Sequence, residues 1–258
     1  MPVLEVRNKK ILYIHIPKTG GSSVENLLRS YGGDLTLYSP RRAGLPCVPQ
    51  HFHGDILKEL FGLESNNRNR DHSFDFIFMT VRHPISRLLS EYRHQRTMHR
   101  LRAATALRPA FELWPQNSPI ADMMSFDHWC KYALLRARRD PFFSNNHLRP
   151  QVEFSVWDPA IYRLEDGLEP IRLQLDQIVG SPGSMPEDPK KSSIDRSGST
   201  ADLRSTTLRM IHSSYAGDFA AYGYKLGPDP ASWSACTVGG VVANNSSGMS
   251  SGTKYNTY

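Results

Sequence analysis

The sequence has few cysteines and no long apolar run. Its 258 residues include Cys47, Cys130 and Cys236, which lie far apart and form no Cys-x-x-Cys pair. We therefore expect neither a disulfide framework nor a cysteine metal site, and a reducing compartment is the default. No apolar stretch approaches the roughly 20 residues of a transmembrane helix, and no signal peptide is recognisable. We expect a cytoplasmic protein without an integral membrane segment.

Acidic residues are in the minority. Asp and Glu number 25 against 31 Lys and Arg, which gives a formal net charge of +6. A basic surface favours an anionic ligand. No Lys/Arg-rich run is interleaved with aromatic residues, however, so nucleic acid is not the expected partner. The length suits one sizeable α/β core, and the sequence leaves the oligomeric state open.

One segment near the N-terminus predicts a site for a phosphate-like group. An apolar run over 11–16 ends at a proline, and a lysine, two glycines and three hydroxyl residues follow before a helical pattern begins. This is a buried strand, a tight loop and a helix N-terminus, a combination that presents N–H groups to an anion. An ordinary turn with a surface lysine is the alternative. The candidate residues are Pro17, Lys18, Thr19, Gly20, Gly21, Ser22 and Ser23.

A second strand-to-helix junction carries Arg82 and Ser90. Arg82 follows a buried strand over 74–81, where open α/β sheets bind ligands, and Pro84 suits the first position of the next helix. Ser90 lies less than two turns into that helix. Two such junctions suit a nucleotide with phosphates at both its 5′ and 3′ ends.

The two junctions together resemble the sulfotransferases that use 3′-phosphoadenosine 5′-phosphosulfate (PAPS). More narrowly, they resemble the carbohydrate branch related to heparan sulfate 2-O-sulfotransferases and their bacterial relatives. The motifs that carry the resemblance are Ile16-Pro17-Lys18-Thr19-Gly20-Gly21-Ser22-Ser23 and Val81-Arg82-His83-Pro84 with Arg87, Ser90 and Tyr92. It covers about residues 8–225. His83 departs from it, since relatives often carry Asn or Asp there.

The resemblance implies a role for each junction. The first loop would hold the 5′-phosphosulfate, with Lys18 on the oxygen that bridges phosphate and sulfate. Arg82 and Ser90 would hold the 3′-phosphate. The segment 184–198, with Lys190 and Lys191, matches no pattern that we can assign.

His51 and His53 are the candidate bases. Sulfuryl transfer to an alcohol needs a proton acceptor, which histidine supplies near neutral pH, and the relatives carry a histidine base in this region. Both side chains point the same way only if the segment is extended, and we favour His51. Two surface histidines or a metal fragment are the alternatives, but no third ligand is evident nearby.

A polar segment over 145–151 supplies candidates for contact with the acceptor or the adenine. They are His147, Arg149 and Gln151. A loop that is simply hydrogen-bonded to the sheet edge explains the same segment equally well.

We expect an α/β fold, a three-layer sandwich like that of P-loop kinases with a mainly parallel sheet of four or five strands. The sulfotransferase domain would span residues 1–226. The predicted strands are 11–16, 35–38, 74–81 and 160–164, and the predicted helices include 55–61, 125–136, 169–178 and 203–224.

The expected reaction is sulfuryl transfer from PAPS to a carbohydrate hydroxyl by in-line displacement, without a metal. One alternative is a nucleotide-dependent phosphotransferase on the same scaffold, although the Gly-Lys-Ser/Thr loop is missing. The other is a non-catalytic protein that binds nucleotide or carbohydrate.

The C-terminal segment has a different composition. Residues 234–258 are rich in Gly, Ser and Asn and resemble a short piece of the flavin-binding domain of FAD-linked oxidases. About 25 residues cannot form such a domain. We therefore expect an irregular tail over 227–258 and no bound FAD.

Overall fold

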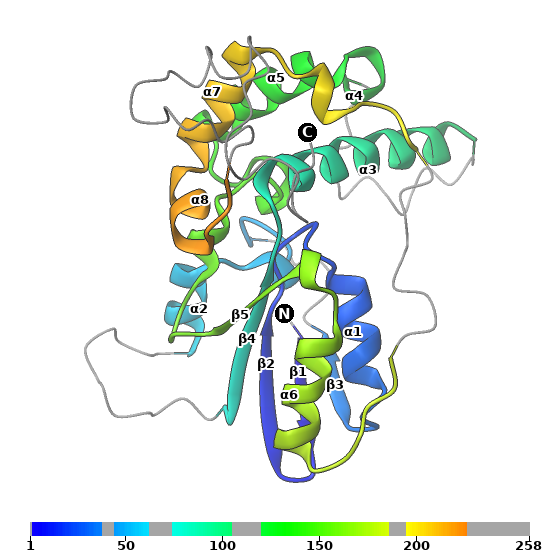
Figure 1. Cartoon of the computed structure of the whole chain (residues 1–258), viewed down its shortest axis with the longest axis vertical. Coiled ribbons are helices and arrows are strands. Elements are labelled where there is room, and N and C mark those ends of the chain that lie inside the picture. Colours follow the sequence, from blue (N-terminus) through cyan, green and yellow to red (C-terminus); the bar gives the residue numbers. More distant parts are fainter. Residues whose placement is uncertain (1, 38–43, 62–73, 105–119, 186–194, 226–258) are drawn as a thin grey trace, which may run out of the picture. The chain divides into compact units, whose positions relative to one another are not determined.

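The computed structural model describes residues 2–37, 44–61, 74–104, 120–185 and 195–225 (Figure 1). They belong to two compact units. The first takes its residues from 1–82 and 141–192, and the second from 83–140 and 193–258. Lys190, Lys191 and the predicted tail over 227–258 lie outside the described residues.

The first unit is built on one five-stranded sheet with the order β3-β1-β2-β4-β5. Its three neighbouring strands β2, β4 and β5 are parallel, whereas β1 is antiparallel to both β2 and β3. The parallel part brings the carboxyl ends of three strands to one edge. The bounds are β1 Pro2–Val6, β2 Lys9–Ile14, β3 Asp34–Leu37, β4 Phe76–Val81 and β5 Ala160–Arg163.

The N-terminal hairpin was not predicted. We expected a single strand over 11–16, but β1 precedes β2, and a tight turn at Arg7 and Asn8 joins them. Both turn residues have positive φ, 48° and 62°, which is the geometry of a two-residue hairpin turn. Because no glycine marks this turn, it could not be predicted from the local pattern.

Helices α1 and α6 cover one face of the sheet (Figure 1). Alternate residues of β2, Ile11 and Tyr13, pack in this layer, while Leu12 and Ile14 are fully buried on the other side. Burial of both faces explains the apolar run that the sequence shows here. The helices of the unit are α1 Gly21–Arg29, α2 Gly54–Phe61 and α6 Glu169–Val179, close to the predicted bounds.

The second unit is helical. Helix α5 begins as expected, because the Ser125 hydroxyl accepts a hydrogen bond from the main-chain N–H of His128. The single helix predicted over 203–224 is wrong: Tyr215 leaves the helical conformation at φ −120° and divides it into α7 and α8. The bounds are α3 Pro84–Ala104, α4 Ile120–Met123, α5 Phe126–Arg139, α7 Ser205–Ser214 and α8 Ala216–Tyr222.

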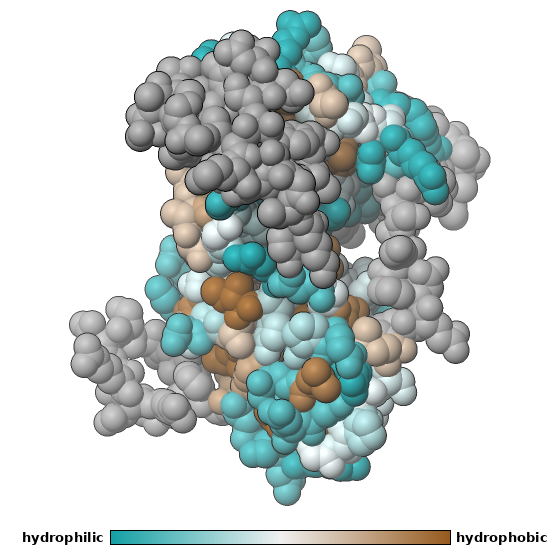
Figure 2. Space-filling view, in the orientation of Figure 1, coloured by the Kyte–Doolittle hydropathy of each residue, from teal (hydrophilic) through white to brown (hydrophobic). Residues whose placement is uncertain are grey.

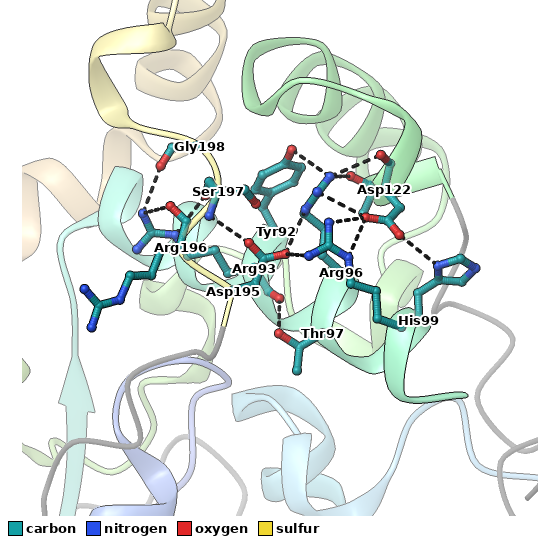
Figure 3. A network of polar contacts seen from close by, with 12 residues as sticks. Tyr92, Arg93, Arg96, Thr97, His99, Asp122, Asp195, Arg196, Ser197 and Gly198 are labelled. Atoms are coloured by element: carbon teal, nitrogen blue, oxygen red, sulfur yellow. Dashed lines mark hydrogen bonds and ion pairs between the residues drawn. The ribbon is translucent and has the colours of Figure 1, made fainter. Parts of the chain in front are cut away.

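A network of arginines on α3 fastens residues 195–198 within the second unit (Figure 3). The Arg96 guanidinium lies 2.9 Å from an oxygen of Asp195 and 3.1 Å from one of Asp122. Arg93 donates to the carbonyls of Ser197 and Gly198 at 3.0 and 2.8 Å. These bonds fix the end of the segment for which the sequence suggested no pattern.

The surface shown in Figure 2 is largely hydrophilic, with separate apolar areas. Among the described residues, the exposed large apolar side chains are Met123, Leu135, Ile161, Leu173 and Met185. They belong to several different elements, as single exposed apolar residues of ordinary proteins do. No helix in the described part of the chain combines the length and the apolar character needed to cross a bilayer.

Candidate active site

The parallel strands bring two predicted junctions to the same edge of the first unit. In the ladder between β2 and β4, Ile14 pairs with Met79, so the loop after β2 and Arg82 after β4 follow at nearly the same level. Open α/β sheets bind ligands at this edge. Lys18 and Arg82 are thereby neighbours, although 64 positions separate them in the chain.

The loop between β2 and α1 has an unusual backbone. Lys18 has a φ of 68° and Gly20 a φ of 91°, both in the left-handed region. This region suits glycine but costs a lysine roughly 1–2 kcal/mol. A non-glycine residue held there at a ligand-binding edge is a recognised mark of functional sites.

A buried chain of hydroxyl groups anchors the loop. The Thr19 hydroxyl donates to the carbonyl of Ile16 at 2.8 Å and lies 3.0 Å from the hydroxyl of Thr80, which is 2.6 Å from that of Tyr13. Thr19 is fully buried. Its side chain therefore faces the core, and any contribution of Thr19 to anion binding comes from its main-chain N–H.

Helix α1 begins at this loop without a capping side chain. Gly20 occupies the N-cap position, and its carbonyl accepts from the N–H groups of Ser23 and Val24. Before Ser23, the first N–H groups of the helix have no acceptor four residues back in the chain, and a helix start carries a partial positive charge. The chemistry of these groups fits a phosphate or sulfate, and Lys18 brings a positively charged residue to the same loop.

The main chain of Arg82 is held in place by the side chain of Gln151. The fully buried Gln151 accepts from the Arg82 N–H through Oε1 and donates to the Arg82 carbonyl through Nε2, both at 2.8 Å. The side chain is turned to the loop, where Nη1 lies 3.4 Å from the Lys18 carbonyl. Gln151 thus bonds the segment 145–151 to the edge of the sheet. This is the second explanation that the sequence allowed for this segment.

His51 lies in a cluster of imidazoles. It ends the short turn Pro49–His51 and is buried. Its ring centre is 4.7 Å from that of His147 and 5.6 Å from that of His15. Burial above all, then the neighbouring histidines, holds the pKa of His51 well below its usual value.

Hydrogen bonding orients the His51 ring. Nδ1 lies 3.1 Å from the main-chain oxygen of Asn145 and 3.1 Å from its side-chain nitrogen. The carbonyl can only accept and the amide nitrogen can only donate, so the first contact requires a proton on Nδ1 and the second requires Nδ1 without one. In the tautomer that donates to the carbonyl, Nε2 is the basic nitrogen. Asn145 has a φ of 57° in a run of three left-handed residues, Ser144 to Asn146.

His53 has separate surroundings, because the segment is not extended throughout. It follows the short turn that contains His51, and its ring centre is 5.7 Å from that of Phe142. Its Nδ1 is buried without a hydrogen-bond partner among the described residues. Burial and then the charge of Arg149 lower the pKa of His53 to about 4.

The comparison with known proteins agrees with this geometry. A model of the sulfotransferase family matches residues 4–225. The chain belongs to the sulfotransferase family. A second, shorter match, to an FAD binding domain, covers residues 215–258. No curated protein and no solved structure matched the chain significantly.

Membership of the sulfotransferase family makes the chain a transferase of the sulfuryl-transfer class. The P-loop-like fold of the family agrees with the three parallel strands and the strand-loop-helix junction of the first unit. The FAD-type match is a small part of the chain, and its described residues are mainly those of α8. No group of three or more His, Cys, Asp or Glu with metal-binding geometry occurs among the described residues.

The remaining predicted residues of this sulfotransferase lie in different places. Arg149 donates to Asn146, to Glu153 and to the carbonyl of Pro141, so its guanidinium takes part in local structure. His147 stands against His51 and stays a candidate for contact with the acceptor. Ser90 lies on α3, in the second unit, and its predicted contact with the nucleotide stays a prediction.

Two polar residues of the site were missed from the sequence, His15 and Glu25. His15 lay inside the apolar run that predicted β2, and Glu25 sits on α1 among exposed and buried positions alike. A histidine at the end of an otherwise apolar strand, directly before an anion loop, was the available signal.

Proposed function

We propose that the chain transfers a sulfuryl group from PAPS to a hydroxyl group of a carbohydrate. The observation that carries the proposal is the approach of Arg82 to the loop of Lys18, since it gathers two cations and a helix N-terminus at one edge of the sheet. Such a donor set suits a doubly charged nucleotide. Membership of the sulfotransferase family supports the same class of reaction.

Each group of the site has its own proposed role in binding or in the reaction. The bound nucleotide supplies the sulfuryl group. The N–H groups at the start of α1 and the Lys18 amine would hold its phosphosulfate end, and Arg82 would hold its 3′-phosphate. As one S–O bond forms and the other breaks, negative charge grows on the oxygen beside Lys18. A fixed cation at that place lowers the barrier.

His51 is our choice for the base. It is neutral near pH 7, because burial keeps its pKa low, and in the tautomer that donates from Nδ1 to the Asn145 carbonyl its Nε2 can accept the hydroxyl proton. A base of this kind contributes roughly 10²–10⁴ in rate. His53 stays the second candidate, since its Nδ1 is buried without a partner among the described residues.

The test is transfer of labelled sulfate from PAPS to a panel of oligosaccharides. We expect transfer by the unmodified protein, a loss of about 10²-fold or more in kcat for His51→Gln, and a smaller loss for His53→Gln. Binding of adenosine 3′,5′-bisphosphate should survive both changes. Failure of the unmodified protein to transfer sulfate to any acceptor would contradict the proposal, and full activity of His51→Gln would remove His51 as the base.

A further inference from the structure

A partly buried acid lies beside the imidazole cluster. Oε1 of Glu25, on α1, is 3.1 Å from Nδ1 of His15, and the two side chains are only 15% and 10% exposed. Nε2 of Gln50 completes the group, 2.8 Å from the same Glu25 oxygen and 2.9 Å from His15 Nδ1. The three side chains come from α1, from the end of β2 and from the turn that holds His51.

The chemistry of the three atoms limits where their protons lie. A carboxylate oxygen only accepts, and an amide nitrogen only donates. The Glu25 oxygen accepts from Gln50, and it accepts from His15 as well when His15 carries its proton on Nδ1, whereas Gln50 can donate to Nδ1 only when that proton is absent. Burial raises the pKa of Glu25, but the hydrogen bond from His15, the charge of His15 when it is protonated and the hydrogen bond from Gln50 together hold this pKa below its usual value. Glu25 is thus a negative charge.

His15 lies between the Glu25 carboxylate and His51, the candidate base. Its ring lies edge-on to that of His51, with ring centres 5.6 Å apart. The His15 ring also rests on the first residue of α1, because a Cβ placed on Gly21 would lie 2.1 Å from His15 Nε2. His15 therefore touches both the start of the anion site and the candidate base.

We propose that His15 and Glu25 form a positioning pair that supplies the counter-charge for the proton taken up by His51. This inference rests on the proposed function. In the transfer, the acceptor oxygen gains its bond to sulfur as its proton moves to Nε2 of His51, and the leaving phosphate oxygen takes the electron pair of the broken S–O bond. A buried imidazolium is costly without a nearby negative charge. The rings that contact His51 are the imidazoles of His15 and His147. Glu25 places a carboxylate beside the first of them, His15.

Because Glu25 lies near the N-terminus of α1, its removal should change nucleotide binding and turnover in different directions. A negative charge on α1, one turn from its N-terminus, opposes an anion bound there. By its charge alone, removal of the carboxylate should leave nucleotide binding unchanged or make it tighter. The proposed counter-charge role predicts a loss of turnover from the same change.

The experiment measures kcat for sulfate transfer and the dissociation constant of adenosine 3′,5′-bisphosphate in Glu25→Gln. We expect kcat to fall about 10- to 100-fold, the size of effect seen when the partner behind a metal-bound histidine is removed. The dissociation constant should stay equal or decrease. His15→Gln should also lower kcat while it retains nucleotide binding. Glu25→Asp, which keeps the charge, should recover part of the loss, and Glu5→Gln, an exposed change on β1, serves as the control.

Three outcomes would overturn the inference. Unchanged kcat in Glu25→Gln would remove the counter-charge role. Weaker nucleotide binding with a normal kcat would make the pair a support of the loop alone. If Glu25→Gln does not fold, an unchanged kcat in His15→Gln decides against the pair. Failure of the unmodified protein to bind nucleotide and transfer sulfate is a separate result, which removes the proposed function and this inference with it.

Discussion

The Arg82 guanidinium lies 3.4 Å from the main-chain carbonyl of Lys18, although the two residues follow different strands of the sheet. The parallel pairing of β2 and β4 sets this approach, and Gln151 holds the main chain of Arg82 in place from both sides. The side chain of Arg82 is therefore directed toward the loop by the sheet itself. Two cationic groups at one edge are the basis of the proposed nucleotide site.

Arg82→Ala should weaken nucleotide binding more than it lowers turnover at saturating PAPS. A bond from arginine to a buried or partly buried phosphate contributes about 1.5–3 kcal/mol, so the dissociation constant of adenosine 3′,5′-bisphosphate should rise 10- to 100-fold. Arg7→Ala, which removes an arginine that bonds the carbonyl of Gly180, is the matched control. Equal affinities in Arg82→Ala and the unmodified protein would remove Arg82 from the site.

Replacement of Lys18 should separate stability from activity. Lys18→Ala and Lys18→Gly both remove the amine, so both should lower kcat far more than they weaken nucleotide binding. Because Lys18 has a φ of 68°, glycine should relieve the backbone, and Lys18→Gly should be the more stable of the two by about 1 kcal/mol. Thermal unfolding measures the stability of each variant, and steady-state kinetics measure its turnover. Near-native turnover in either variant would contradict the role of the amine.

Gly21→Ala should disturb the loop through His15. The new Cβ would lie 2.1 Å from His15 Nε2, so the ring must move away from its contacts. Such overpacking costs about 1–3 kcal/mol. In a His15→Ala background the space is free, and the same change should cost much less. Additive free energies of unfolding in this double-mutant cycle would show that the two residues do not meet.

Asp195 should make the stability of the protein depend on acid pH. Burial alone would raise its pKa, but hydrogen bonds from Ser197 and the charge of Arg96 lower it to about 2. The stabilisation is therefore complete above the ordinary value of 3.8 and is lost as the pH falls from 3.8 toward 2.

Asp195→Asn tests this dependence. We expect a loss of about 2 kcal/mol in the free energy of unfolding near pH 7 and a weaker decline between pH 4 and pH 2. The measurement is denaturant unfolding over a series of pH values. The exposed change Asp34→Asn is the control, and an Asp195→Asn curve parallel to that of the unmodified protein would contradict the assignment.

The sequence predicted the elements whose patterns are local. The strand before Lys18, the helix after Pro84 and the helix capped by Ser125 all have signals within a few residues, and the structure has each of them. The hairpin at Arg7 and Asn8 was missed because its turn has no glycine.

Contacts between distant segments were beyond the sequence. The break at Tyr215 lies inside a continuous helical pattern, and a buried aromatic residue in that pattern gives no sign of it. The inward bond of the Thr19 hydroxyl depends on Thr80 of another strand, and the His15–Glu25 pair depends on how α1 packs against the end of β2. Such pairings follow from tertiary packing, which a single sequence does not specify.

Calorimetric titration of the protein with adenosine 3′,5′-bisphosphate, and in parallel with adenosine 5′-phosphate, tests the nucleotide site most directly. We expect one site per chain that prefers the bisphosphate at least tenfold, with the preference reduced in Arg82→Ala. Equal affinity for the two nucleotides, or no heat of binding with either, would contradict it.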